Sequence, residues 1–324
     1  KEIAIDLETR DPNLLTMGSG SVRGDGEVIG IAIAVEGWSG YFPINHEGGG
    51  NMDRALTLDW FEEVLHTPAT KIFHNAMYDV SWIRSLGFQI NGGIVDTLIA
   101  ASLINENRWG YSLNALGKEY VGMGKNEKIL NEAAKDWGVD PKSEMWRLPA
   151  PLVGEYAEQD AIVTLKLWHA LQHEISKQDL WDVFNMETNL FPCLVDMKFK
   201  GVRVDINKAE ALKKQLTVTE KDMHRDIKKL AGFDVEIWAA ASIAKAFDKE
   251  KIPYDRTEKG APSFTKNFLA THPAELPKLI NEAREINKAN TTFIETILKH
   301  EHNGRIHADI NQIRSDQGGT VTGR

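Results

Sequence analysis

The chain contains 324 residues, of which 42% are hydrophobic and 26% charged, and its net charge at pH 7 is −9. This is the composition of a globular protein with one or two domains, and no run of about 18 apolar residues suggests a membrane-spanning helix. The single cysteine, Cys193, excludes an internal disulfide and a cysteine-rich zinc site and predicts a reducing compartment, the cytoplasm. The first residues form no signal peptide. Because the chain lacks a starting methionine and opens on an expected strand, we expect a piece of a longer protein.

The charge is distributed unevenly along the chain. Residues 1–185 contain 15 Lys and Arg against 27 Asp and Glu, a net charge of −12. Residues 186–324 contain 23 against 20, a net charge of +3. This asymmetry indicates an acidic domain joined to a mildly basic one. We interpret most of the acidic excess as solvated surface and a small part of it as metal-binding carboxylate.

Residues 1–180 show the pattern of a mixed α/β domain, with strands first and helices packed against them. The expected strands are 2–9, 28–35, 41–44 and 71–73. The stretch 28–35 is nearly all apolar, as in a buried central strand. The expected helices are 60–65, 75–86 and 152–177, with a short strand or helix start at 94–97 continuing through 103, and helix and loop over 108–151.

After about residue 180 helical patterns dominate, and the expected helices cover 181–199, 207–231, 239–250 and 274–300. Asp205 precedes the second of them as a typical N-cap residue, and Gly232 follows it where a glycine commonly ends a helix. We interpret most lysines of its long charged face as solvated.

Asp6 and Glu8 are two residues apart on the first expected strand. Their side chains therefore point to the same face, where two carboxylates repel each other unless a cation holds them. The pair alone is weak evidence, because surface strands carry such pairs by chance.

Two further carboxylates are each paired with a polar residue at helical spacing. Asn75 and Asp79 lie four residues apart at the start of a helix, and Tyr156 and Asp160 lie four apart within a later one. For the first pair, the alternative to a functional role is that Asn75 caps the helix and Asp79 is exposed. For the second pair, the alternative is a chance spacing. The three patterns occur in this order over about 155 residues of α/β pattern, and together they are more specific evidence for a functional site than any one of them alone.

Three segments resemble the exonuclease motifs of the DEDD superfamily, in its tyrosine-bearing branch: Asp6-Leu7-Glu8-Thr9, His74-Asn75-Ala76-Met77-Tyr78-Asp79 and Tyr156-Ala157-Glu158-Gln159-Asp160. The resemblance implies a ribonuclease H-like fold over residues 1–180, a mixed five-stranded sheet flanked by helices. It also implies 3′→5′ exonuclease activity, and no expected carboxylate is missing.

The resemblance further implies two divalent ions, Mg²⁺ or Mn²⁺. Two ions about 3.5–4 Å apart supply a hydroxide near neutral pH and neutralise phosphate charge, and oxygen ligands suit them. By resemblance, Asp6, Glu8 and Asp160 hold the ion that activates water, and Asp6 with Asp79 holds the other. Tyr156 orients the water, because a phenol with a pKa near 10 is a poor base at pH 7.

Leu7, Asn75 and Met77 are expected, by the same resemblance, to line the 3′-terminal nucleotide.

The second half resembles the thumb and the start of the palm of family A DNA polymerases. The matching segments, in order, are 185–191, 195–205, 242–247, 259–263, 284–288, 304–308 and 318–324. We therefore expect a helical thumb-like region at 181–303 and the start of a palm at 304–324. The palm's metal-binding aspartates would follow the last residue, so the expected function is the proofreading exonuclease portion of a phage or bacterial polymerase.

Three basic residues of this half match DNA-contacting positions of that family. Arg284 and Lys288 match thumb positions that contact duplex phosphates, and Arg324 matches a palm arginine that reaches the primer terminus. For the first two, an ordinary solvated helix face is the alternative.

The expected partner is DNA, with a single-stranded 3′ end at the exonuclease site and a primer–template duplex at the thumb. We expect a monomer, which replication accessory factors could accompany. Two alternatives remain open: a free-standing exoribonuclease of the ribonuclease D type, and a DNA-holding fragment with an idle exonuclease site.

Overall fold

The computed structural model describes residues 1–313, which form two compact units. The first unit comprises Lys1–Gly201 and the described residues from His307 onward, and the second comprises Val202–Ile306. The expected boundary near residue 180 does not coincide with this division. Helix α8 (Trp181–Lys200) belongs to the first unit, because Phe184 and Phe191 pack into two of its core clusters.

The residues expected to open a palm also return to the first unit where they are described. Ile310 and Ile313 pack against its two core clusters, and Asp309 pairs with the buried Lys198 at 2.7 Å. Gly318 to Arg324, with the last expected motif, lie outside the described residues.

The first unit is built on a mixed five-stranded sheet in the order β3-β2-β1-β4-β5, which confirms the expected architecture. The central strand β1 runs antiparallel to β2 and parallel to β4. The outer pairs continue these directions, β2 with β3 antiparallel and β4 with β5 parallel. The bounds are β1 (Glu2–Arg10), β2 (Glu27–Val35), β3 (Trp38–Pro43), β4 (Thr70–Phe73) and β5 (Ile94–Asp96).

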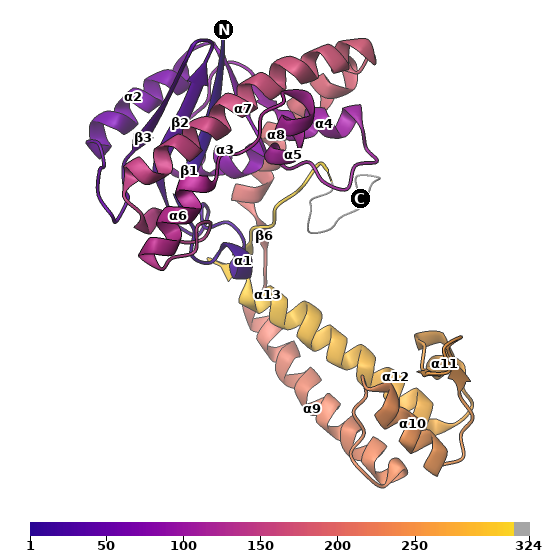
Figure 1. Cartoon of the computed structure of the whole chain (residues 1–324). Coiled ribbons are helices and arrows are strands. Elements are labelled where there is room, and N and C mark those ends of the chain that lie inside the picture. Colours follow the sequence, from indigo (N-terminus) through magenta and orange to yellow (C-terminus); the bar gives the residue numbers. More distant parts are fainter. Residues whose placement is uncertain (314–324) are drawn as a thin grey trace. The chain divides into compact units, whose positions relative to one another are not determined.

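Helices cover both faces of this sheet (Figure 1). They are α1 (Leu14–Met17), α2 (Arg54–His66), α3 (Ala76–Ser85), α4 (Thr97–Ile104), α5 (Leu113–Tyr120), α6 (Lys128–Trp137), η1 (Met145–Arg147), α7 (Ala150–Lys177) and α8. The long helix α7 crosses β1, β2 and β3 and packs its small residues Ala157 and Ala161 against them. Ala4 of β1 belongs to the core on this α7 face, whereas Ile5 and Leu7 belong to the core on the opposite face.

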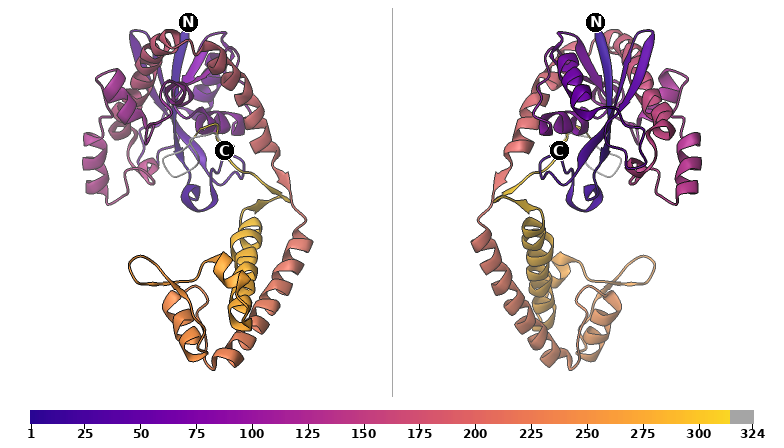
Figure 2. Two further views of the ribbon diagram at one scale, coloured as in Figure 1. Left: turned by 90° about the vertical axis from the view of Figure 1, so that its right-hand side faces the viewer. Right: turned by 90° about the vertical axis from the view of Figure 1, so that its left-hand side faces the viewer.

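The second unit is mainly helical, as expected. Its elements are β6 (Val202–Arg203), α9 (Ile206–Ala231), α10 (Ala240–Lys249), β7 (Asp255–Arg256), β8 (Pro262–Ser263), α11 (Lys266–Thr271), α12 (Glu275–Lys288), η2 (Ala289–Ile294), α13 (Glu295–Lys299), β9 (Glu301–His302) and β10 (Arg305–Ile306). Helix α9 lies alongside the continuous helix formed by α12, η2 and α13 (Figure 2).

Both predicted caps of α9 are confirmed. The Asp205 carboxylate accepts a hydrogen bond of 3.0 Å from Lys208 N, and Gly232 ends the helix in the left-handed conformation with φ 76°. In the described part of the chain, no helix is both long and apolar enough to cross a membrane.

Candidate active site

Asp6 and Glu8 lie on β1, on the face covered by α7, because side chains alternate along a strand and Ala4 of the same face packs beneath α7. The residue of β2 opposite Glu8 is Gly30. A Cβ at this glycine would lie 2.0 Å from the Tyr41 hydroxyl, so the absence of a side chain lets the Tyr41 ring lie beside the carboxylates. The tyrosine hydroxyl lies 2.6 Å from Nε2 of His46.

Asp79 reaches the same strand from α3. Its Oδ1 accepts a hydrogen bond of 2.9 Å from the backbone N–H of Leu7, between the other two carboxylates, and the side chain is buried at 4% exposure. Asp79 lies behind the strand and does not line the cleft that the other three carboxylates line. It remains close to the other carboxylates, because burial and then the charge of Asp6 raise its pKa.

The start of α3 explains how Asn75 reaches the cleft. Asn75 adopts a left-handed backbone conformation with φ 67°, and its side chain does not cap the helix. The Asp96 carboxylate takes over capping by accepting hydrogen bonds from Asn75 N at 2.9 Å and Ala76 N at 2.8 Å. The exposed Asn75 side chain therefore lines the cleft together with Leu7 and Met77, which brings the three expected nucleotide-lining residues together.

Asp160 and Tyr156 come from one face of α7 and complete the group. Asp160 is 2% exposed, and its Oδ1 has no hydrogen-bond partner among the described residues. A buried carboxylate oxygen without a donor is costly unless a cation or a water satisfies it. Tyr156 lies one helical turn before it and lines the same cleft.

Lys125, which the sequence analysis did not single out, contacts both of these side chains. Its ammonium donates a hydrogen bond of 2.9 Å to the Tyr156 hydroxyl and forms an ion pair with Asp160 Oδ2. Lys125 belongs to a loop between α5 and α6 with no hydrophobic period or charged motif of its own. A lysine that follows Gly122 and Gly124 is the weak signal that the sequence offers.

The electrostatics of the cluster follow from burial and mutual repulsion. Burial and the charge of Asp160 raise the pKa of Asp6 to about 7. Burial and the neighbouring carboxylates raise the pKa of Glu8 and of Asp79 well above the usual range. Burial also raises the pKa of Asp160, against the opposing effect of Lys125. Four carboxylates with raised pKa values are a site that binding of cations would stabilise.

The cleft that contains the cluster has a volume of about 1080 Å³. The oxygen-only donor set and the unpartnered Asp160 Oδ1 fit Mg²⁺ or Mn²⁺. As the side chains stand, no three His, Cys, Asp or Glu residues within 1–313 form a group able to hold a metal ion.

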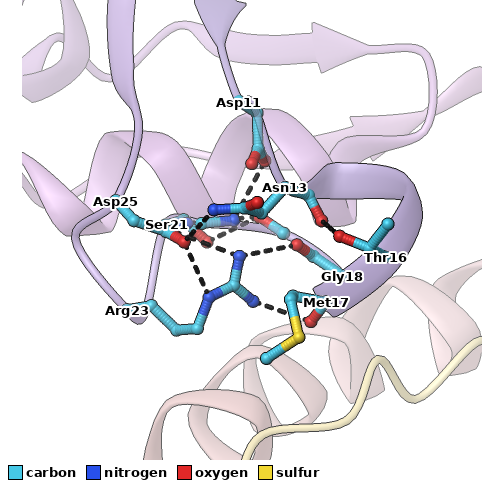
Figure 3. Close-up of polar contacts among 10 residues, drawn as sticks. Asp11, Asn13, Thr16, Met17, Gly18, Ser21, Arg23 and Asp25 are labelled. Carbon is cyan, nitrogen blue, oxygen red and sulfur yellow. Dashed lines mark hydrogen bonds and ion pairs between the residues drawn. The ribbon is translucent and has the colours of Figure 1, made fainter. Parts of the chain in front are cut away.

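One wall of the cleft is formed by the loop between β1 and β2, which contributes Leu14, Leu15 and Gly18. Leu15 is 86% exposed. Figure 3 shows the guanidinium of Arg23 inside this loop, where it donates to Met17 O at 2.7 Å and Gly18 O at 2.9 Å.

Two acidic side chains complete the bonding of this loop. Asp25 accepts hydrogen bonds from Arg23 Nε at 3.1 Å and from Asn13 Nδ2 at 3.0 Å (Figure 3). Asp11 accepts a hydrogen bond of 2.9 Å from Gly20 N. The wall is therefore held by its own polar side chains rather than by an apolar core.

The expected duplex-contacting residues of the second unit differ in their surroundings. Arg284 donates hydrogen bonds to Ile237 O at 2.6 Å and Phe264 O at 2.9 Å, and its guanidinium stacks on Trp238 at 5.1 Å from the ring centre. These contacts tie three segments of the unit together, so Arg284 is a structural residue in this structure. Lys288 is exposed on α12, and Arg324 lies outside the described residues.

A family model of the 3′-5′ exonuclease of DNA polymerase A matches residues 1–176, the stretch that holds all five catalytic candidates. The chain belongs to this family. The resemblance found in the sequence is thereby confirmed, and residues 1–201 are called the exonuclease unit below.

Two phage proteins are similar over most of the chain. A DNA-directed DNA polymerase of Pseudomonas phage M6 is 35% identical over 97% of this chain and 48% of its own length. DNA polymerase DpoZ of Acinetobacter phage SH-Ab 15497 is 32% identical over 82% of this chain and 47% of its own length. The chain thus spans about half the length of these relatives.

The fold of the chain is also similar to a solved structure. The POL domain of Pol1 from M. smegmatis, in complex with DNA primer-template and dNTP, superposes with a TM-score of 0.70 over 96% of this chain and 48% of that one. At 18% sequence identity, this similarity concerns the fold.

Proposed function

We propose that the exonuclease unit hydrolyses the 3′-terminal phosphodiester of single-stranded or frayed DNA, as the proofreading part of a DNA-directed DNA polymerase. The observation that carries this proposal is the convergence of Asp6, Glu8, Asp160 and Tyr156 on one cleft, with Asp79 bonded directly behind the strand. In α/β enzymes such clusters of perturbed carboxylates are candidates for metal-dependent chemistry.

Two Mg²⁺ or Mn²⁺ ions bound there would supply a hydroxide and neutralise the charge of the phosphate. Asp6, Glu8 and Asp160 would hold one ion, and Asp6 with the second oxygen of Asp79 would hold the other. Tyr156 keeps its proton, because burial and the nearby carboxylates raise its pKa far above neutral. Its hydroxyl therefore orients the attacking water by hydrogen bonding and does not remove a proton.

We expect Leu7, Asn75 and Met77 to contact the terminal nucleotide, because they line the same cleft as Asp6, Glu8 and Asp160. The backbone N–H of Leu7 is already bonded to Asp79, so it is not free to donate to the nucleotide. The narrow acidic site favours an unpaired end, since a base pair would have to open before its phosphate reached the carboxylates.

For the second unit we propose contact with the backbone of duplex DNA through exposed lysines such as Lys288. A mildly basic helical unit fits a partner recognised by its phosphates rather than by its base sequence. The DNA held by the M. smegmatis Pol1 domain, which has this fold, supports DNA as the partner.

The test is digestion of a 5′-labelled single-stranded DNA by the purified chain with Mg²⁺, followed on a sequencing gel. Products that shorten one nucleotide at a time from the 3′ end are expected, and EDTA or the Asp160→Asn substitution should abolish them. A single-stranded RNA of the same sequence is the comparison. Faster digestion of the RNA would contradict the proofreading role and favour the exoribonuclease alternative.

A further inference from the structure

We propose that Lys125 is a positioning residue of the exonuclease site: it holds the Tyr156 hydroxyl and, until metal binds, also neutralises Asp160. The proposal rests on the proposed exonuclease function. It adds a sixth polar residue to the four carboxylates and Tyr156, and this residue lies outside the three exonuclease motifs.

The main chain around Lys125 is fixed by side chains on two helices. Its backbone N–H donates to Asn114 Oδ1 on α5 at 3.0 Å. The preceding carbonyl, of Gly124, accepts a hydrogen bond of 3.2 Å from Gln159 Nε2 on α7. On the other side, Asn126 Nδ2 donates to Glu155 Oε1 of α7 at 2.8 Å. Three bonds in three consecutive residues aim the Lys125 side chain at one face of α7.

Two glycines allow this loop to lie close to α5. A Cβ at Gly117 would lie 2.5 Å from Met123 O, and a Cβ at Gly124 would lie 2.6 Å from Asn114 Oδ1. Real Cβ atoms do not approach other atoms so closely, so a side chain at either position would push the loop away. The sequence around Lys125 is therefore adapted to bring its ammonium to the carboxylates.

The charges give Lys125 its first role. Its side chain is 22% exposed and that of Asp160 is 3% exposed, so the pair is largely removed from water. The ammonium is also close enough to Asp6 and Glu8 to lower their pKa values against the effect of burial. In the metal-free site it thus balances one of four like charges. An ion held by both oxygens of Asp160 would displace the ammonium from Oδ2, so Lys125 and metal compete for that carboxylate.

The contact with Tyr156 gives the second role. The ammonium donates to the phenol oxygen at 2.9 Å and lies 5.0 Å from the ring centre. A phenol that accepts this bond points its own hydrogen away from the lysine. When Lys125 gives up Asp160, the hydrogen bond to Tyr156 still holds the hydroxyl in one orientation. We therefore expect Lys125 to act on the reaction through Tyr156.

The first test measures metal binding without catalysis. Mn²⁺ titration followed by calorimetry should show that Lys125→Met binds metal roughly tenfold more tightly than wild type, because no ammonium has to be displaced. In EDTA, the same variant should melt at a lower temperature than wild type, and saturating Mn²⁺ should remove the difference. Lys128→Met, an exposed lysine at the start of α6, is the matched control and should leave both quantities unchanged.

The second test separates positioning from packing. At saturating metal and substrate, Lys125→Met should lower kcat several-fold with little change in KM, and Lys125→Arg should restore part of the loss. In a Tyr156→Phe background, Lys125→Met should cost nothing further, because the hydroxyl that it positions is already gone.

Two results would overturn the inference. An unchanged Mn²⁺ affinity in Lys125→Met would show that Lys125 does not compete with metal for Asp160. If the kcat loss of the double variant equals the product of the losses of Lys125→Met and Tyr156→Phe, Lys125 does not act through Tyr156. Failure of the proposed function is distinguishable from both, because it would appear as a wild-type protein that digests no DNA whatever its metal affinity.

Discussion

The backbone N–H of Leu7 donates a hydrogen bond of 2.9 Å to Oδ1 of Asp79, 72 residues away in the chain. This bond fixes the helix-borne carboxylate relative to β1, on which Asp6 and Glu8 stand on either side of Leu7. In the proposed metal site, the second oxygen of Asp79 would be a ligand. The bond therefore gives Asp79 two separable contributions, one to the fold and one to the site.

These contributions predict different outcomes for two substitutions. Asp79→Asn keeps a carbonyl oxygen for Leu7 N and removes one of four like charges, so stability without metal should be retained or increased while digestion is lost. Asp79→Ala leaves a buried N–H unsatisfied and should cost about 1–3 kcal/mol of unfolding free energy. Urea denaturation in EDTA measures both. Equal stability of the two variants would show that the bond does not support the fold.

The raised pKa of Asp6 predicts how stability depends on pH in the absence of metal. The folded state binds the Asp6 proton with a pKa of about 7, compared with about 3.9 in an unfolded chain. The stabilisation from this proton is fully present below pH 4 and is lost as the pH rises toward 7. Asp6→Asn has no such proton to lose.

Asp6→Asn should therefore gain stability relative to wild type between pH 4 and pH 8 in EDTA, by at most about 4 kcal/mol. Saturating Mg²⁺ should reverse the order at pH 8, because only wild type retains the full ligand set. Asp59→Asn, an exposed residue of α2, is the control and should follow wild type. A pH-independent difference between Asp6→Asn and wild type would contradict a buried, repelling cluster.

Tyr156→Phe should separate the orientation of water from the binding of metal. The substitution keeps the ring and removes the hydroxyl, so we expect a several-fold or larger loss in kcat with Mn²⁺ affinity nearly unchanged. Single-turnover digestion and calorimetry on the same preparation measure the two effects. A large loss of metal affinity would instead make the hydroxyl part of the architecture of the metal site.

The sequence was sufficient to predict the sheet and the long helix α7, because both depend on local periodicity. It also predicted that the four carboxylates lie near one another, because each belongs to a short motif, and the structure has three of them in one cleft and Asp79 behind β1. It did not predict that α8 belongs to the first unit, since an amphipathic helix does not reveal which core covers it. It also did not predict the contacts of Lys125 or the capping of α3 by Asp96, because these partners are distant in sequence and meet only in the folded chain. Arg284 matched a motif, but its bonds to two carbonyls depend on how distant loops fold.

Arg23 offers a test of the loop that walls the cleft. Arg23→Lys keeps the charge but cannot donate to Met17 O, Gly18 O and Asp25 at once, because a lysine lacks the planar guanidinium. We expect KM for short single strands to rise several-fold, with metal affinity and the melting temperature of the exonuclease unit little changed. Leu15→Ser, which changes the exposed wall and leaves the network intact, should raise KM in the same way. If neither variant changes KM, the loop does not contact the substrate.

The last prediction concerns Arg284 and Lys288 of α12, which have different surroundings in the structure. Arg284→Glu removes donors from Ile237 O and Phe264 O and places a carboxylate between the segments, so the second unit should be destabilised by roughly 2–4 kcal/mol. Lys288→Glu changes an exposed side chain, and surface substitutions usually alter stability by less than about 0.5 kcal/mol. It should weaken binding to duplex DNA and reduce the salt slope of that binding by about one.

Single-strand digestion should be unchanged in Lys288→Glu, because the exonuclease cleft lies entirely in the other unit. Denaturation, duplex affinity over a salt series and digestion of a short single strand give three independent readouts. Lys259→Glu, in the loop between β7 and β8, is the control for a charge reversal elsewhere in the unit. If the control reduces the salt slope as much as Lys288→Glu does, duplex DNA is attracted by the overall charge of the unit rather than by a face of α12.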